Sequence, residues 1–198
     1  MTWIALTMTV AYLMGSVPFA YLLVRWSGRG DVRRVGSGNV GATNTLRAAG
    51  WKAAAAVLVL DIAKGVAAVL LMTRVTADPA WHAAAGAAVV IGHCFPVWLK
   101  FAGGKGVATA GGVFILLAPV AAAAAAGVWG LVLAVSRRVS ISSMAAAACY
   151  PVALWYLARP RLPVLVWVSA ISLVVLWRHR SNLERLIRGE EPPVGKKS

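Results

Sequence analysis

The sequence predicts an all-α integral membrane protein with about seven transmembrane helices, two of them short or half-spanning, joined by glycine-rich loops on the cytoplasmic side. The 198-residue chain is 60% hydrophobic and has a mean hydropathy of +0.76. Apolar runs of about 20 residues, the length that crosses a hydrocarbon core, recur along it. Charged residues make up only 13% of the chain, whereas soluble domains carry about 25%.

The apolar runs predict the helices in chain order. They cover residues 3–26, 51–72, 81–99, 107–135, 141–157 and 164–177. The first run continues through Gly15, Ser16 and Pro18 without an evident small-residue cleavage site, so we interpret it as a retained span rather than a signal peptide.

Basic residues predict the orientation. Twenty Lys and Arg residues against six acidic ones give a formal net charge of +14, and cytoplasmic loops carry an excess of such residues. Residues 27–50 and the C-terminal segment are both basic, so both should be cytoplasmic. The run 107–135 must then leave and return, as two short helices broken near Pro119. The N-terminus is predicted outside.

The sequence predicts one membrane domain, residues 1–190, followed by a short basic tail, residues 191–198. A net charge this high suggests nucleic acid in a soluble protein, but loop charges explain it here, so we predict the lipid bilayer and no nucleic acid as partner. Cys94 and Cys149 have no metal-ligand spacing and are interpreted as packing residues. We expect no metal and no cofactor.

Two glycine-rich stretches predict anion sites. Glycines allow neighbouring backbone amides to turn inward together and bind phosphate. The stretch "VGSGNVGATNTLRAAG" combines such glycines with hydroxyl and amide side chains and ends near Arg47, whose guanidinium can form two hydrogen bonds to phosphate. The stretch "GGKG" repeats the pattern with Lys105. No Ser or Thr follows Lys105, so this is not a Walker loop.

Further polar residues leave alternatives open. In "WRHRSNLERLIRGEE", His179 and Asn182 would share a helix face, although such a helix is often only a basic anchor. His93 is interpreted as a structural histidine at a helix end, with a ligand role as the alternative. Asp61 and Lys64 would neutralise each other within the membrane, or support the site. Ser142 and Ser143 could cap a helix or face a phosphate.

Three motifs carry a family resemblance. The stretches "GSGNVGATN…LR", "GHCFPVWLKFAGGKGVAT" and "RHRSNLERLIRGEE" resemble, in order, the signature motifs of the bacterial acyl-phosphate:glycerol-3-phosphate acyltransferase family, the PlsY type. The similarity covers residues 15–190. It implies a bacterial inner-membrane enzyme with seven transmembrane helices that moves an acyl chain from acyl-phosphate to position 1 of glycerol-3-phosphate. The products are lysophosphatidic acid and phosphate, and neither metal, acyl-CoA nor acyl-carrier protein takes part.

The resemblance also implies site residues. Catalytic positions fall on Ser37, Arg47, Lys105, His179 and Asn182. Substrate and phosphate contacts fall on Gly38, Asn39, Gly41, Thr43, Asn44, Gly103, Gly104, Gly106 and, less closely matched, Ser143. Glu184 or Glu190 is expected to be structural.

The chemistry is consistent with two anion loops, because both implied substrates carry phosphate. An acyl-phosphate is already activated, so the protein mainly has to orient it and neutralise charge. A covalent intermediate on Ser37 is conceivable, but no base lies near it in the sequence, and direct attack by the glycerol hydroxyl is preferred. A transporter of organic phosphates is the main alternative; it would more often show internal repeats and broken helices at midplane. A basic membrane scaffold would leave the loop glycines unexplained.

Overall fold

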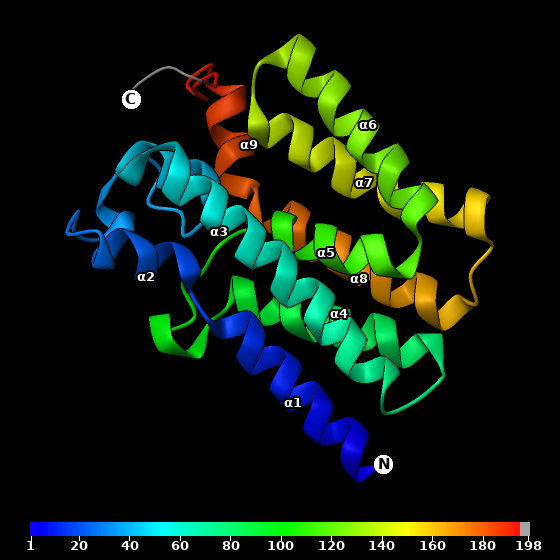
Figure 1. Cartoon of the computed structure of the whole chain (residues 1–198). Coiled ribbons are helices and arrows are strands. Elements are labelled where there is room, and N and C mark those ends of the chain that lie inside the picture. Colours follow the sequence, from blue (N-terminus) through cyan, green and yellow to red (C-terminus); the bar gives the residue numbers. More distant parts are fainter. Residues whose placement is uncertain (195–198) are drawn as a thin grey trace.

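The computed structural model describes residues 1–194, and the last four residues of the predicted basic tail lie outside this part. The described chain is all helical (Figure 1). Its α-helices are α1 (Thr2–Ser16), α2 (Phe19–Trp26), α3 (Ala42–Thr73), α4 (Pro79–Cys94), α5 (Val107–Leu117), α6 (Pro119–Ser136), α7 (Val139–Ala158), α8 (Leu162–Arg178) and α9 (Arg180–Ile187). Two short 3-10 turns, η1 (Val32–Arg34) and η2 (Val97–Leu99), lie in the loops.

Membrane-spanning helices form most of the structure, which confirms the predicted fold class. Within residues 1–194, five helices or helix pairs are long and apolar enough to cross a membrane, and a sixth span results if α8 and α9, bent by 48°, count as one. Helix α5, with 11 residues, is a shorter apolar helix. The predicted break at Pro119 exists, because this proline occupies the first turn of α6, where its missing N–H costs no hydrogen bond. Of the two helices predicted to be short, only α5 is. The prediction is wrong for α6, whose 18 residues are long and apolar enough to cross a membrane because the helix continues to Ser136.

Two helix breaks place polar segments at the end of the bundle. Pro18 separates α1 from α2. Gly50, with φ 83° and ψ 179°, interrupts the helical geometry of α3, a conformation that only glycine adopts readily. The span predicted to start at residue 51 therefore begins just after this kink, and residues 42–49 form a separate helical segment that belongs to the first glycine-rich loop.

Reciprocal glycine contacts bring the central helices close together. A Cβ atom on Gly15 of α1 would lie 2.1 Å from the Val89 carbonyl oxygen of α4, and one on Gly92 of α4 would lie 2.1 Å from the Tyr12 carbonyl oxygen of α1. Gly65 of α3 and Gly112 of α5 approach the facing backbone in the same way. Small residues permit such close approach in membrane helix pairs. These pairs fix α1 against α4 and α3 against α5.

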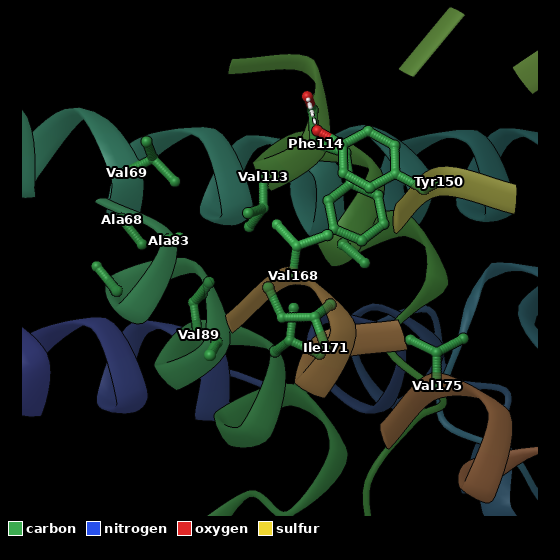
Figure 2. Packing of buried hydrophobic residues seen from close by; sticks show 14 of the residues in the cluster. Ala68, Val69, Ala83, Val89, Val113, Phe114, Tyr150, Val168, Ile171 and Val175 are labelled. Carbon is green, nitrogen blue, oxygen red and sulfur yellow. Dashed lines mark hydrogen bonds between the residues drawn. The ribbon is translucent and has the colours of Figure 1, made fainter. Parts of the chain in front are cut away.

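Apolar side chains fill the rest of the interior. Figure 2 shows Val89 of α4, Val113 of α5, and Val168 and Ile171 of α8 packed around one point. Beside them the rings of Phe114 and Tyr150 stack with centroids 3.7 Å apart. The buried Tyr150 hydroxyl donates a 3.0 Å hydrogen bond to the Phe114 carbonyl, which satisfies the one polar group of that ring where α5 ends.

All three polar motifs lie at the same end of the bundle. In Figure 1 the loop before α3, the loop before α5 and helix α9 gather on the left, whereas the N-terminus, the α3–α4 link and the α7–α8 link lie on the right. Helix α5 runs away from the left end and α6 runs back to it (Figure 1). This is the arrangement required if the two basic segments lie on one side of the membrane. The fold therefore assembles one polar end from segments up to about 150 residues apart in the sequence.

Candidate active site

The first loop is built around Asn44. This side chain is 1% exposed, and both of its amide protons are used: Nδ2 donates to the carbonyl oxygens of Val32 (2.8 Å) and Val35 (2.9 Å). Its Oδ1 accepts from the backbone N–H of Ser37 at 3.2 Å. The structure thus gives Asn44 a loop-holding role. Of the other predicted residues here, Gly38 has φ +67°, Asn39 and Gly41 are half-buried, and Thr43 and Ser37 are exposed.

Arg47 lies on the inner side of the same loop. Asn44 and Arg47 are three residues apart on the helical segment before the kink, so they share a face. Both lie against Gly36, where a Cβ atom would meet Asn44 Oδ1 at 2.7 Å and Arg47 Cδ at 3.1 Å. Arg47 forms no ion pair with any residue of the described chain. Its guanidinium is therefore half-buried beside the loop glycines and free to bind an anion.

The second loop is held by the end of α4 and by Arg178. The N–H groups of Gly103 and Gly104 donate to the carbonyl oxygens of Cys94 (3.2 Å) and His93 (3.1 Å). Arg178 donates from the other side, through Nη2 to the Gly103 carbonyl at 2.7 Å and through Nε to that of Gly104 at 3.0 Å. Gly106, with φ +83°, is the N-cap of α5. The loop conformation is thus fixed on both sides.

Lys105 projects from this loop toward α9, where Asn182 Oδ1 accepts a hydrogen bond from its Nζ. Burial lowers the pKa of Lys105 to about 8, and the positive charges of Arg185, Arg178 and Arg47 act in the same direction against the opposing effect of Glu191. Lys105 therefore remains mostly protonated at neutral pH, and Arg47 of the first loop lies within electrostatic range of it. Two loops and the third motif converge on one cationic centre.

Glu191 completes this centre, and the sequence analysis missed it. The side chain is 8% exposed. It accepts hydrogen bonds from Asn182 Nδ2 at 2.6 Å and from Arg185 Nε at 2.7 Å. Burial would raise the pKa of Glu191, but its contacts with Ser140, Asn182 and Arg185 outweigh burial and lower it. Glu184 and Glu190, the glutamates expected to be structural, are both exposed. The available signal in the sequence was the pair of carboxylates directly after Gly189, the second of which is Glu191.

The chain after α9 continues to pack against the bundle. Arg138 Nε donates to the Glu191 carbonyl at 3.0 Å, and the Val194 N–H donates to the Arg137 carbonyl at 2.7 Å. The two basic residues that precede α7 therefore hold the segment that carries Glu191.

His179 lies at the bend between α8 and α9 and is 3% exposed. Its Nδ1 is 2.8 Å from the Val175 carbonyl oxygen. A carbonyl can only accept, so Nδ1 carries the proton and Nε2 is left as an acceptor. Burial lowers the pKa of His179 to about 4, and nearby Lys105 and Arg178 contribute to the lowering. His179 is thus neutral at pH 7, with the lone pair of Nε2 available.

The serines near the start of α7 are less closely linked to the centre. Helix α7 begins at Val139, so neither Ser142 nor Ser143 caps it. Ser142 donates to the Arg138 carbonyl of its own helix at 3.0 Å. The Ser143 hydroxyl accepts from Trp129 of α6 at 3.3 Å. Among residues 1–194 no hydrogen bond joins Ser143 to Lys105 or Asn182.

No metal-binding group is evident in the described chain, since nowhere in residues 1–194 do three His, Cys, Asp or Glu side chains gather as metal ligands would. The side-chain groups that converge on the site are an ammonium, guanidinium groups, an amide, an imidazole and the Glu191 carboxylate. Such a set is suited to holding phosphate and to stabilising negative charge. The predicted use of the loop amides as phosphate donors does not hold for Gly38, Gly41, Gly103 and Gly104, whose N–H groups donate to carbonyl oxygens of the chain.

Comparisons with known proteins agree with this chemistry. The family model described as glycerol-3-phosphate acyltransferase matches residues 5–189. The chain is 47% identical to the glycerol-3-phosphate acyltransferase of Erythrobacter litoralis over 189 residues, 95% of this chain and 93% of that protein. It is 44% identical to the corresponding protein of a Jannaschia species, covering 98% and 95% of the two chains.

Two solved structures have the same fold. Both are crystal structures of PlsY (YgiH), an integral membrane glycerol 3-phosphate acyltransferase. The glycerol 3-phosphate form superposes with a TM-score of 0.92 and 36% identity over 97% of this chain and 96% of that one. The lysophosphatidic acid form gives a TM-score of 0.89 and 35% identity over 97% and 95%.

Proposed function

The chain belongs to the glycerol-3-phosphate acyltransferase family, and on this premise we propose that it transfers a fatty acyl group from acyl-phosphate to position 1 of glycerol-3-phosphate, giving lysophosphatidic acid and phosphate in phospholipid synthesis. The observation that carries the proposal is the cationic centre. Lys105 and Arg47, from two separate glycine-rich loops, lie close enough to act on each other electrostatically, and neither is paired with a carboxylate among residues 1–194. Two cations of this kind suit two phosphorylated substrates.

In the proposed reaction the glycerol hydroxyl oxygen bonds to the acyl carbonyl carbon, and the bond between that carbon and the phosphate oxygen breaks. Phosphate leaves with the electron pair, and the hydroxyl proton ends on a phosphate oxygen. Arg47 and Lys105 hold phosphate groups and stabilise the charge that develops on the leaving oxygen. Asn182 orients Lys105, and the loop glycines with Asn39 and Thr43 shape the two anion sites.

His179 has a defined role in this proposal. With Nδ1–H bound to Val175, its Nε2 can accept the proton of the attacking hydroxyl in a hydrogen bond and so aim the oxygen lone pair at the carbonyl. A histidine whose pKa is lowered to about 4 is a weak base, and an anhydride of this kind needs little base assistance. His179 therefore positions the nucleophile, and a substrate phosphate takes the proton.

Ser37 is not required as a covalent nucleophile. It is exposed, and within residues 1–194 no histidine or carboxylate hydrogen-bonds to its hydroxyl; its recorded contact is the backbone N–H bond to Asn44. An unactivated serine hydroxyl is a weak nucleophile. We therefore assign Ser37 to substrate contact, whereas the buried Ser143 hydroxyl accepts from Trp129 and has no assigned role.

Phosphate release by the purified protein tests the function. A long-chain acyl-phosphate with glycerol-3-phosphate should release phosphate and form lysophosphatidic acid, with EDTA present, and acyl-CoA should give no product. Loss of turnover with EDTA, or equal use of acyl-CoA, would contradict the proposal. A proton-coupled uptake of glycerol-3-phosphate into vesicles without acyl transfer would instead identify a transporter.

The role of His179 is tested by three variants measured side by side, with folding checked. His179→Gln places an amide near the position of Nε2, His179→Asn keeps only a donor near that of Nδ1, and His179→Ala keeps neither. We expect His179→Gln to retain clearly more activity than the other two. Equal inactivity of all three would favour a general-base role instead.

We also propose that this single domain lies in the bacterial inner membrane with the active site facing the cytoplasm and the N-terminus outside. Most Lys and Arg residues of the described chain lie at the site end, whereas those at the opposite end are Arg74, Arg159 and Arg161. In intact cells a membrane-impermeant thiol reagent should label a cysteine at Thr2 but not one at Ser181, both of which are exposed. Labelling of the Ser181 position alone would reverse the topology.

A further inference from the structure

A second group of charged side chains is buried beneath the Gly103–Gly106 loop. Asp61 and Lys64 lie one turn apart on α3, and His93 is near the end of α4. Their exposed fractions are 2%, 5% and 9%. Lys64 Nζ is 2.8 Å from Asp61 Oδ1, so the two charges balance locally. None of the three residues has a part in the proposed acyl transfer.

Lys64 ties three helices together. Besides Asp61 Oδ1, its Nζ lies within hydrogen-bond distance of the carbonyl oxygens of Gly15 (3.0 Å) and Val17 (3.2 Å) and of His93 Nδ1 (2.9 Å). The two carbonyls lie at the break between α1 and α2, where Pro18 ends the helical ladder and leaves acceptors without their usual partners. Lys64 on α3 thus satisfies the break and connects it to α4.

His93 passes this connection to the loop. Nδ1 lies 2.9 Å from Lys64 Nζ and 3.4 Å from Asp61 Oδ1, so the ring contacts both charged partners. Nε2 lies against Gly104, where a Cβ atom would be only 2.1 Å away. The carbonyl oxygens of His93 and Cys94 also receive the N–H groups of Gly104 and Gly103. The ring and the backbone of His93 therefore both support the loop that carries Lys105.

A small cavity joins this group to both glycine-rich loops. It is lined by Asp61 and His93, by the α1–α2 break at residues 15–20, by Val40 of the first loop and by Gly103 of the second. The two loops meet here, because a Cβ atom on Gly104 would also lie 2.6 Å from the Val40 carbonyl oxygen. A shift of His93 would therefore displace both glycine-rich loops and change the geometry of both anion sites.

We propose that Asp61, Lys64 and His93 form a positioning network that holds the Gly103–Gly106 loop, and through it Lys105, in the geometry that binds a substrate phosphate. Charged groups within a membrane are costly and mark function, and apolar residues of similar size would often stabilise a buried site more than an ion pair does. Positioning of the Gly103–Gly106 loop thus explains why these costly charged groups are buried here. This proposal rests on the proposed function, in which Lys105 binds phosphate.

Steady-state kinetics of His93 variants test the network. His93→Leu removes the polar contact with Lys64 and Asp61 and the ring beneath Gly104, whereas His93→Asn keeps a polar amide near the position of Nδ1. Displacement of a loop by about 1 Å can cost up to about a hundredfold. We expect His93→Leu to raise the KM for at least one phosphorylated substrate by about tenfold or more with kcat within about threefold, and His93→Asn to restore most of it.

His82 supplies the matched control. Its Nε2 lies 2.8 Å from the Thr76 carbonyl oxygen at the opposite end of the bundle, so His82→Leu removes a similar histidine contact far from the loop and should leave both KM values unchanged. If His93→Leu does not fold, His93→Phe, which keeps a ring without either nitrogen, replaces it. A purely structural role would lower the amount of active enzyme and its thermal stability but leave KM as in the wild type, and that result would overturn the proposal.

A double-mutant cycle separates the network from the site itself. If His93 acts through Lys105, the double variant His93→Leu with Lys105→Ala should have a KM no worse than Lys105→Ala alone. Additive increases would overturn the network proposal while leaving the phosphate site intact. If Lys105→Ala itself leaves every KM and kcat unchanged, the phosphate site of the proposed function is wrong, and the network proposal falls with it.

Discussion

Two lysines in this molecule are partly or fully buried near a carboxylate, and they are arranged differently. Lys64 lies 2.8 Å from the Asp61 carboxylate, and two carbonyl oxygens and His93 Nδ1 also lie within hydrogen-bond distance of its Nζ. Lys105 is separated from the Glu191 carboxylate by Asn182, whose Oδ1 accepts from Lys105 and whose Nδ2 donates to Glu191. Arg185 forms the direct ion pair with Glu191.

The difference shows how a protein keeps one cation for a ligand. Lys64 is neutralised by Asp61 and surrounded by further acceptors, so it holds the inner network in place and does not bind a ligand. In the outer cluster the amide of Asn182 fixes the position of Lys105 without neutralising it, since Arg185 takes the carboxylate. The remaining donors of Lys105 and its positive charge are then available to an anion. The following predictions test this contrast, from the largest expected effect to the smallest.

Removal of the inner cation should have the largest effect, and it should be on stability. Lys64→Met leaves Asp61 buried without a counter-charge, which costs roughly 3–5 kcal/mol. The double variant Lys64→Met with Asp61→Asn removes both charges and should recover much of that loss. Unfolding of the purified variants in detergent measures both. Equal stability of the single and double variants would show that the pair is not the self-neutralising unit described here.

Removal of an outer cation should instead reduce activity with stability retained. Lys105→Ala and Arg47→Ala should each lose at least about 2 kcal/mol of transition-state stabilisation, as expected for a lost charge-assisted contact to phosphate. Arg47→Lys should recover little, because the forked contact is lost. The exposed cations Lys52 and Arg34 at the same end serve as alanine controls. An alanine variant of Lys105 or Arg47 with wild-type kcat/KM would remove that residue from the site.

A methyl group at the meeting point of the two loops should have a smaller effect. Gly104→Ala would place Cβ 2.1 Å from His93 Nε2 and 2.6 Å from the Val40 carbonyl oxygen. The His93 ring and the Val40 carbonyl are both held in place, so the loop must shift. Such a shift typically lowers the free energy of unfolding by about 1–3 kcal/mol. Gly111 of α5 has nothing within 4 Å of its Cβ position, and Gly111→Ala should be tolerated. Thermal unfolding and kcat/KM, measured together, compare the two; equal behaviour would mean that His93 is mobile.

A carboxylate in place of the spacer amide should make the outer lysine resemble the inner one. Asn182→Asp would pair directly with Lys105 and lower kcat/KM by about tenfold, roughly 1.4 kcal/mol. Asn182→Asp also replaces the Nδ2 donor to Glu191 by a second carboxylate, whereas Asn182→Ala removes the contacts to both Lys105 and Glu191 without adding charge. Asn182→Ala should therefore be less damaging than Asn182→Asp if added negative charge is the cause. The opposite order would show that Asn182 acts through its hydrogen bonds alone.

The pH dependence should show the smallest effect. Burial lowers the pKa of Lys105 to about 8, so its charge is present below that pH and is lost as the pH rises through it. The profile of kcat/KM, which reports the free enzyme, should fall about twofold from its plateau near pH 8 and further above it. Lys105→Arg keeps its charge throughout this range. An alkaline fall that is identical in Lys105→Arg would assign the titration to another group.

The helices and their order were predictable from the sequence, because hydropathy and helix breakers act locally. Apolar length identified the spans, Pro119 divided the fifth and sixth helices, and the basic segments placed all three motifs at one end. The site residues within the motifs were inferred from the family resemblance, and their roles stay predictions; the structure adds that Lys105 and Asn182 are in contact.

Only the tertiary structure decided how individual side chains are used. It showed that the Asn44 side chain bonds to the backbone of the first loop. It also showed that His179 Nδ1 bonds to Val175, which leaves Nε2 as an acceptor. Of the three glutamates Glu184, Glu190 and Glu191, it is Glu191 that is buried. The tertiary structure also turned Asp61, Lys64 and His93, separated by up to 32 residues, into one network. The physical reason is that a hydrogen bond depends on distance and direction between atoms. Those are fixed by helix packing and chain breaks, and neither composition nor spacing along the sequence contains them.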